Sequence, residues 1–476
     1  MIQESHVFEQ FVHTVPDQTV YGEYKSKLES AQDESKLPYD LQLERKNLID
    51  LKILEEEPRR GESVLRTPNP TWIQVLQSNV YSTIDSINQA FTKKPVDAYN
   101  VESLANKKIK HMAWHPEQRV LAVCNKNDII YVYYFPHDDM YGMNQVRPLS
   151  LWFELQTNVQ DLQWKPFHPY ILAVASDNGV ILWEIDINDL KMSVKNISTS
   201  TSMPMASTGV HHQGYNQSKT NSSILNYPYF RPTTITWSSN GMLLACGSPT
   251  FSSILMWDVA SRVPSFVPRH GGNSFLCWSK TTDNLLSCSA ASSGNKNNSN
   301  SNFRIWNISN WSYNNQEWKV PSSYQTGAWS DKGDFLAVAS TDKIYFIQCL
   351  HKAFDSGAGE LVFIEKTSSY KIFYNNQDIF VGGHIKKIAW SPDGQRLAVI
   401  FFLNRHSNDS DTMIALYRVK TSPKFTLTPR GFIKKRESSA NSIAFVPNYS
   451  KGSLLSVSYN DGCISFFPLL YRHKLV

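Results

Sequence analysis

The sequence repeats one phrase seven times, and this repeat restricts the fold more than any other feature. Each copy has a short apolar run that ends in an aromatic residue, then a tight turn, a second apolar run, a polar turn and a third apolar run. In the first copy these runs are 109–114, 120–123 and 129–133. The aromatic residues that end the first run of each copy are Trp114, Trp164, Trp237, Trp278, Trp329, Trp390 and Phe445.

The spacing of these aromatic residues indicates a ring of similar sheets. Successive residues are 50, 73, 41, 51, 61 and 55 positions apart. The shortest interval fits the WD40 unit of about 40–45 residues, and the longer intervals contain inserted loops. Each copy supplies three strands, and a linker such as 149–155 can supply a fourth. Because a lone sheet leaves an apolar face uncovered, neighbouring copies must stack, and closing the ring removes long exposed edges.

We therefore expect an all-β fold, a seven-bladed WD40-type β-propeller over residues 109–470 with an N-terminal helical extension. A β-sandwich or an open β array is the alternative. The last copy ends close to the C-terminal end, 471–476. Its outermost strand is therefore expected from the N-terminal chain, from either 6–13 or 98–104.

The extension covers residues 1–108, and its apolar spacing predicts two helices. The first spans about 40–57 and stops at Pro58. The second spans about 71–92 and begins with a capping box formed by Thr71 and Gln74.

The second predicted helix carries the candidate partner-binding surface. Its opposite face has no Lys or Arg, which a helix lying on anionic lipid would carry. We therefore expect protein contact and no direct insertion into a membrane. The helix packs either against its own propeller or against another protein. The candidate partner-binding residues on its apolar stripe are Trp72, Val75, Leu76, Val80, Ile84, Ile87 and Phe91.

Two polar segments are expected to be disordered inserts. Residues 191–231 are rich in Ser, Thr, Asn and Gln, and residues 292–302 are of low complexity. Neither segment can bury enough apolar surface to offset the entropy of ordering. We interpret both as tolerated loops, with a regulated or partner-binding role as the alternative.

The composition limits the class of protein. The chain has 476 residues and a net charge of +5, too mild an excess to indicate direct nucleic-acid binding. No run approaches the roughly 18 apolar residues of a membrane span, and the N-terminus lacks a signal-peptide pattern. The six cysteines form no CxxC pair, so a reducing, intracellular setting is expected.

The search for chemistry finds no catalytic, cofactor-binding or metal-binding residues. Nucleotide-binding, hydrolase and zinc-protease motifs are missing from the sequence. The remaining candidates do not converge on a site, and the carboxylate pair and basic clusters among them are better interpreted as solvated: His211-His212, Asp138-Asp139, Lys434-Lys435-Arg436 and Lys386-Lys387. We therefore expect a protein that is not an enzyme and needs no cofactor.

Several phrases resemble the Aladin family of WD-repeat nucleoporins. They are 113–116, 162–166 with 172–175, 254–259, 324–330 and 451–457. The resemblance implies a noncatalytic scaffold of the nuclear pore complex at the nuclear envelope, held there by a transmembrane nucleoporin and other pore components. It also implies a role in nucleocytoplasmic transport and a second role at mitotic spindle poles. Only Trp257-Asp258 matches the WD dipeptide, so we expect the usual WD hydrogen-bond network to be missing from most blades.

The alternative function is a substrate receptor of a cullin-type ubiquitin ligase. Such receptors commonly carry Trp-Asp-x-Arg at the end of a strand. Here Arg262 follows Trp257-Asp258 two positions too late, which disfavours this interpretation.

Overall fold

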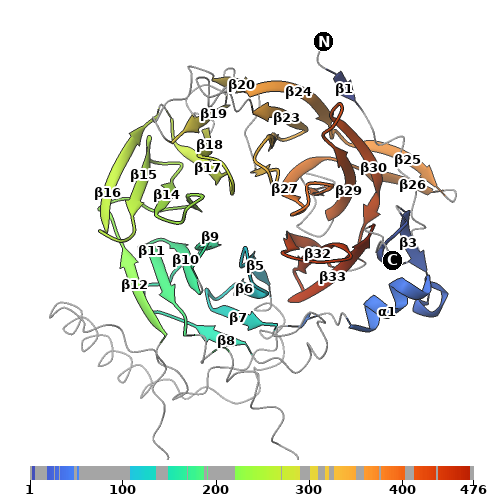
Figure 1. Ribbon diagram of the computed structural model, residues 1–476, viewed down its shortest axis with the longest axis horizontal. Coiled ribbons are helices and arrows are strands. Elements are labelled where there is room, and N and C mark those ends of the chain that lie inside the picture. Colours follow the sequence, from blue (N-terminus) through green and yellow to red (C-terminus); the bar gives the residue numbers. More distant parts are fainter. Residues whose placement is uncertain are drawn as a thin grey trace, which may run out of the picture.

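The computed structural model describes residues 3–5, 19–25, 27–31, 33–47, 51–52, 108–135, 148–168, 170–186, 190, 220–269, 271–289, 301–308, 317–320, 326–349, 359–374, 377–402, 412–435 and 438–471. Over these ranges the chain is nearly all β, and its one α-helix is α1 (Tyr39–Asn47). Seven sheets stand around a central axis as the blades of a propeller (Figure 1). The predicted seven-bladed fold is confirmed.

Each blade is an antiparallel meander that runs from the centre of the ring outward. In chain order the blades are β5 (Ile109–Trp114), β6 (Val120–Asn125), β7 (Ile130–Tyr134) and β8 (Leu149–Leu151); β9 (Asp161–Trp164), β10 (Ile171–Ser176), β11 (Gly179–Glu184) and β12 (Asn221–Leu225); β13 (Thr234–Trp237), β14 (Leu243–Gly247), β15 (Ser253–Asp258) and β16 (Val263–Pro268); β17 (Asn273–Trp278), β18 (Asn284–Ser289), β19 (Ser301–Asn307) and β20 (Trp318–Val320); β21 (Thr326–Trp329), β22 (Phe335–Ala339), β23 (Lys343–Cys349) and β24 (Gly359–Lys366); β27 (His384–Trp390), β28 (Arg396–Phe402), β29 (Thr412–Lys420) and β30 (Thr426–Ile433); β31 (Ala440–Val446), β32 (Gly452–Tyr459) and β33 (Cys463–Leu470). A separate hairpin, β25 (Tyr370–Tyr374) and β26 (Gln377–Val381), lies between the fifth and sixth blades in the sequence.

The repeated aromatic residue occupies the same position in every blade. It ends the innermost strand or, for Phe445, comes one residue before its end, and it always pairs with a leucine of the second strand. The pairs are Trp114 with Leu121, Trp164 with Leu172, Trp237 with Leu244, Trp278 with Leu285, Trp329 with Leu336, Trp390 with Leu397, and Phe445 with Leu455. The repeat in the sequence therefore marks one register that is used seven times.

The hydrophobic core lies between blades. Seven buried clusters each join two neighbouring blades, and together they go once around the ring. The cluster between the seventh and first blades, for example, combines Leu121 and Tyr131 with Leu454 and Phe466. Because the apolar side chains of each sheet are buried against the next sheet, the fold needs the closed ring.

Indole nitrogens join neighbouring blades. Trp164 donates its Nε1–H to the carbonyl of Ala113 at 3.0 Å, and Trp329 donates to the carbonyl of Cys277 at 2.9 Å. Trp237 bonds Gln163 in the same way at 3.2 Å. There are two exceptions: Trp390 donates within its own blade to the carbonyl of Gly394 at 3.0 Å, and the buried Nε1 of Trp278 has no hydrogen-bond partner among the described residues. Packing and these indole bonds connect the blades.

N-terminal strands close the ring. β2 (Thr19–Tyr24) runs parallel to one end of β33, with Glu23 beside Leu469, and β4 (Leu51–Lys52) pairs antiparallel with its other end. A hairpin partner, β3 (Lys27–Ala31), covers β2. The two segments that we considered for this strand, 6–13 and 98–104, lie outside the described residues, and the place beside β33 belongs to β2 and β4.

Gly22 shows how closely β2 approaches the last blade. A Cβ at this position would lie 2.4 Å from the carbonyl oxygen of Pro468 and 2.9 Å from a methyl carbon of Leu41. A side chain does not fit there, so glycine permits the strand to reach β33. Further upstream, β1 (Gln3–Ser5) pairs parallel with β24 on the outside of the fifth blade.

The N-terminal helix is shorter than the predicted span of 40–57. A 3-10 turn (Glu34–Lys36) precedes α1, which ends at Asn47, and Leu51 then pairs with Ile464 at the edge of the sheet. Pairing with an open sheet edge replaces the helical continuation that the leucine spacing predicted. The helix predicted over 71–92 lies outside the described residues.

The polar insert predicted over 191–231 contains an ordered end. Residues 220–231 are described, and β12 within them pairs with β11, with Ile224 beside Ile181. Similarly, Ser301 and Asn302 of the predicted 292–302 loop begin β19. In both cases backbone pairing orders residues whose own side chains are too polar to predict a strand.

Candidate functional site

The candidate partner-binding residues are not placed by the structure. Trp72, Val75, Leu76, Val80, Ile84, Ile87 and Phe91 all lie outside the described residues, as do Asp138-Asp139 and His211-His212. The partner-binding surface predicted from them therefore stays a prediction.

The basic pair near the end of the sixth blade is a surface feature. Lys435 forms an ion pair of 2.7 Å with Asp461, and both side chains are partly exposed. Its ammonium group also lies 4.6 Å from the centre of the Tyr459 ring. These contacts agree with a solvated face for Lys434 and Lys435; Arg436 lies outside the described residues.

The other basic pair, Lys386-Lys387, lies at the centre of the ring. Both residues are on the innermost strand β27 and bond the neighbouring innermost strand β31. Lys386 donates to Asn441 Oδ1 at 2.6 Å, and Lys387 donates to Ser442 Oγ at 2.8 Å. The interpretation of this pair as a solvated face is therefore wrong for Lys387, which is enclosed at the centre of the ring with His111 of β5 and Asp161 of β9.

Burial and mutual charge shift the pKa values of this central group. Burial lowers the pKa of His111 to about 3, with help from Lys387 and Lys110. Burial raises the pKa of Asp161 to about 6, although the amides of Ile235 and Leu162 and the charge of Lys387 oppose the rise. Burial also lowers the pKa of Lys387, and Asp161 opposes that change.

The contacts of the central group connect blades. Asp161 accepts a bond of 3.1 Å from the amide of Ile235 in the third blade, and Lys387 reaches the seventh blade through Ser442. Four of the innermost strands, β5, β17, β27 and β31, also carry a bulge near their first residues. Bulges redirect side chains, and here they place polar groups where neighbouring strands meet. The arrangement supports the ring itself.

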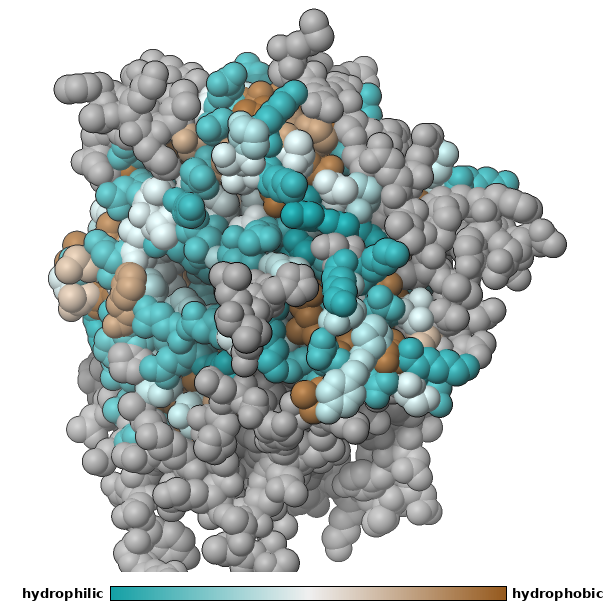
Figure 2. Space-filling view, turned by 45° about the vertical axis from the view of Figure 1, so that its right-hand side comes forward, coloured by the Kyte–Doolittle hydropathy of each residue, from teal (hydrophilic) through white to brown (hydrophobic). Residues whose placement is uncertain are grey.

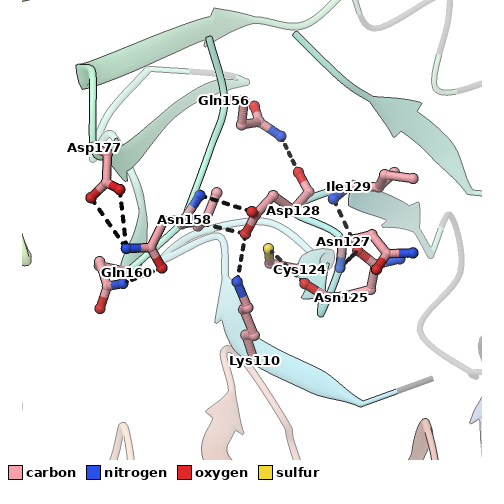
Figure 3. A network of polar contacts seen from close by, with 11 residues as sticks. Lys110, Cys124, Asn125, Asn127, Asp128, Ile129, Gln156, Asn158, Gln160 and Asp177 are labelled. Carbon is pink, nitrogen blue, oxygen red and sulfur yellow. Dashed lines mark hydrogen bonds and ion pairs between the residues drawn. The ribbon is translucent and has the colours of Figure 1, made fainter. Parts of the chain in front are cut away.

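A second polar network joins the first and second blades on one face. Asp128, in the turn between β6 and β7, accepts bonds from Lys110 Nζ at 2.7 Å and from the amides of Asn158 and Val159 at 2.8 and 2.9 Å (Figure 3). Asn158 in turn contacts Asp177 in the next blade. The network fixes the loop that leads into the second blade.

The described part of the chain contains neither an activated thiol nor a cluster of metal-ligating side chains. The six cysteines are free and mostly buried, and burial raises the pKa of Cys277, Cys288 and Cys349 to about 12. Such thiols are poor nucleophiles. No group of three or more metal-ligating side chains occurs among the residues with described positions. In the same residues, no helix has the length and apolar character of a membrane span.

Comparison with known proteins now identifies the family. The model of the Aladin seven-bladed propeller matches residues 96–470, which is most of the chain. The chain belongs to the Aladin family. It is 24% identical to the protein named Aladin from Arabidopsis thaliana over 420 residues, which cover 85% of this chain and 83% of that relative. The match confirms the family resemblance seen in the sequence, and neither comparison supports the ubiquitin-ligase receptor.

The Aladin match begins after the N-terminal elements that close the ring. β1, β2, β3, α1 and β4 all precede residue 96. They nevertheless contribute buried side chains, among them Glu23 and Leu41, each with 0% exposure. Sequence reasoning missed Glu23 because an acidic residue in a short polar strand gives no signal of burial.

Helix α1 is also anchored to the last blade of the Aladin propeller. Glu44 accepts bonds from the Tyr449 hydroxyl, at 2.8 Å, and from the Lys451 ammonium. Arg45 donates to the carbonyl of Phe466 at 3.0 Å. The N-terminal chain is therefore bound to the last blade both by the strands β2 and β4, which pair with β33, and by the side chains of α1.

Proposed function

We propose that this chain is a noncatalytic scaffold or adaptor of the nuclear pore complex. The observation that carries the proposal is the Aladin family match over residues 96–470. In this role the protein is held at the nuclear envelope by a transmembrane nucleoporin, contacts other pore components and supports nucleocytoplasmic transport.

The architecture suits a scaffold. Seven inter-blade cores and a closed set of innermost strands make a rigid ring. Binding residues are often carried on loops that a rigid framework positions. A protein interface of ordinary size covers roughly 800 Å² per partner, which one face of a propeller can supply.

Imaging and proximity labelling test the proposal together. The full chain, fluorescently tagged at its own locus, should give a punctate nuclear rim, and labelling from it should enrich membrane proteins of the pore. The free tag serves as the control. A diffuse signal with labelling of soluble cytosolic proteins alone would reject the proposal. We also propose a second location at the mitotic spindle poles, and imaging of the tagged chain through mitosis tests it.

A further inference from the structure

The loop that joins the second and third blades displays one tyrosine entirely to solvent. Residues 227–230 form a turn in which the amide of Phe230 donates to the carbonyl of Tyr227 at 3.1 Å. Pro228 is the second residue of the turn and Tyr229 the third. Tyr229 has a φ of 62° and a side chain that is 103% exposed.

This backbone conformation is unfavourable for tyrosine. The third position of a turn with positive φ favours glycine or asparagine, because a Cβ crowds the backbone there. Tyr229 makes no hydrogen bond, ion pair or ring contact with the described residues that would compensate. A costly residue that adds no internal contact points to a role outside the fold.

Other aromatic residues and prolines lie beside the turn that carries Tyr229. The ring of Tyr227 lies 5.0 Å from that of Phe266 on β16, and Phe266 lies 6.1 Å from Phe251. Phe266 is 42% exposed although it is a large apolar residue. We name this surface the Tyr229 patch, and it consists of Tyr227, Pro228, Tyr229, Phe251, Phe266 and Pro268. Figure 2 shows a largely hydrophilic surface with some hydrophobic residues at its left margin, on the side where Figure 1 draws β15 and β16.

The strand beside the patch is poorly suited to accept a further strand. β16 is the outer strand of its blade and contains Pro264 and Pro268. These residues are four positions apart, so the two missing N–H groups belong to the same side of the strand. A partner must therefore bind through the side chains of the patch.

The segments that form the patch carry no negative charge of their own. Residues 226–233, 249–253 and 265–269 contain no carboxylate, whereas they include the exposed Arg231 and the buried Arg269. Aromatic surfaces of this kind accept proline-rich segments, because the polyproline II helix is already formed and its rings pack on aromatic faces. Arg231 favours acidic residues in the same segment.

We propose that the Tyr229 patch binds an extended, proline-rich, acidic segment of another protein. Tyr229 and Phe266 provide the apolar contacts, and Arg231 selects the negative charge. The proposal does not depend on the location of the protein at the nuclear pore.

Fluorescence anisotropy with the full chain and labelled synthetic peptides tests this surface. The probes are (Pro-Pro-Glu)₄, (Pro-Pro-Lys)₄ and an acidic helical peptide of equal length. The wild type should prefer the first probe, and Tyr229→Asn and Tyr229→Gly should weaken its binding at least about tenfold, as for an aromatic hot spot. Arg231→Ser should reduce the preference for Glu over Lys.

The matched control is Phe167→Gly. Phe167 follows Pro166 in the turn between β9 and β10, has a φ of 55° and is 71% exposed, but it lies at the opposite end of the strands. This variant should bind the first probe as the wild type does. The midpoint of thermal unfolding should not fall in Tyr229→Asn, since the side chain contributes nothing to the fold. No binding by the wild type, equal binding by Tyr229→Asn, or preference for the helical peptide would each overturn the proposal.

Discussion

The guanidinium group of Arg396 and the carboxylate of Glu23 form a buried, two-point ion pair across the closure of the ring. Arg396 Nε lies 2.8 Å from Glu23 Oε2, and Arg396 Nη2 lies 2.6 Å from Glu23 Oε1. The exposed fractions of the two side chains are 1% and 0%. Arg396 begins β28 of the sixth blade and Glu23 lies on β2, so the pair joins the N-terminal strand to a blade that it does not pair with.

Loss of one partner should cost much stability. Glu23→Gln leaves the Arg396 charge buried without its counter-charge, which typically costs about 3–5 kcal/mol. Urea unfolding of the full chain measures the change. The exposed Lys435–Asp461 pair provides the comparison, and Lys435→Gln should cost less than about 1 kcal/mol. Equal losses in the two variants would contradict the role of the buried pair.

A comparison of two tryptophans distinguishes the contribution of the indole hydrogen bond to the free energy of unfolding from the contribution of packing. Trp164 and Trp278 are equally buried repeat residues, at 4% and 5% exposure, but only Trp164 donates to a neighbouring blade. Trp164→Phe should therefore lower the free energy of unfolding by about 1 kcal/mol more than Trp278→Phe. Chemical denaturation of the two variants tests this, and a larger loss for Trp278→Phe would show that the cross-blade bond adds nothing.

The repeat predicted the fold because it reports local structure. Each aromatic residue ends or nearly ends an innermost strand and faces a leucine of the second strand, so seven copies in the sequence correspond to seven blades. The outer strands were harder to predict. Asn221–Leu225 is ordered by its pairing with β11, and Thr19–Tyr24 by its pairing with β33. These contacts join residues that are distant in the sequence or that carry polar side chains.

The candidate site was predictable to a smaller extent. The sequence indicated Lys386-Lys387 as a basic pair but did not show that Lys387 shares the centre of the ring with His111 and Asp161. Those residues belong to different blades, and only closure of the ring brings their charges together. Glu23 was missed for the same reason, because its partner Arg396 is 373 positions away.

Two deletions of different length at the N-terminus should differ in their effect on the stability of the propeller. Deletion of residues 1–18 removes β1, which forms three residue pairs on the edge of the fifth blade, and the ring should remain closed. Deletion of residues 1–31 also removes β2 and β3 with the buried Val20, Glu23 and Ala31, and β33 should then keep only the short strand β4 on its outer edge. Size-exclusion chromatography and thermal unfolding should show a monodisperse, stable first variant and an aggregated or strongly destabilised second one. A stable second variant would show that β33 needs neither β2 nor β3.

The pKa shifts of His111 and Asp161 at the centre of the ring predict two opposite contributions to the pH dependence of stability. The folded-state pKa of His111 is about 3, below the ordinary value of 6.5, so the unfolded chain binds the extra proton between these values. His111 therefore makes the protein more stable as the pH rises from about 3 to 6.5. The folded-state pKa of Asp161 is about 6, above its ordinary 3.8, so the folded protein binds the extra proton and Asp161 makes it less stable as the pH rises through that range.

Near pH 5 the two slopes, each close to 1.4 kcal/mol per pH unit for one full proton, should nearly cancel. Substitution of one residue should reveal the other. His111→Gln should lose stability as the pH rises from about 4 to 6, whereas Asp161→Asn should gain stability over the same interval. Urea unfolding at several pH values measures both slopes against the wild type, and the curve of the double variant should again run parallel to that of the wild type. Parallel curves for the wild type and the two single variants would mean that neither group titrates differently in the folded ring and in the unfolded chain.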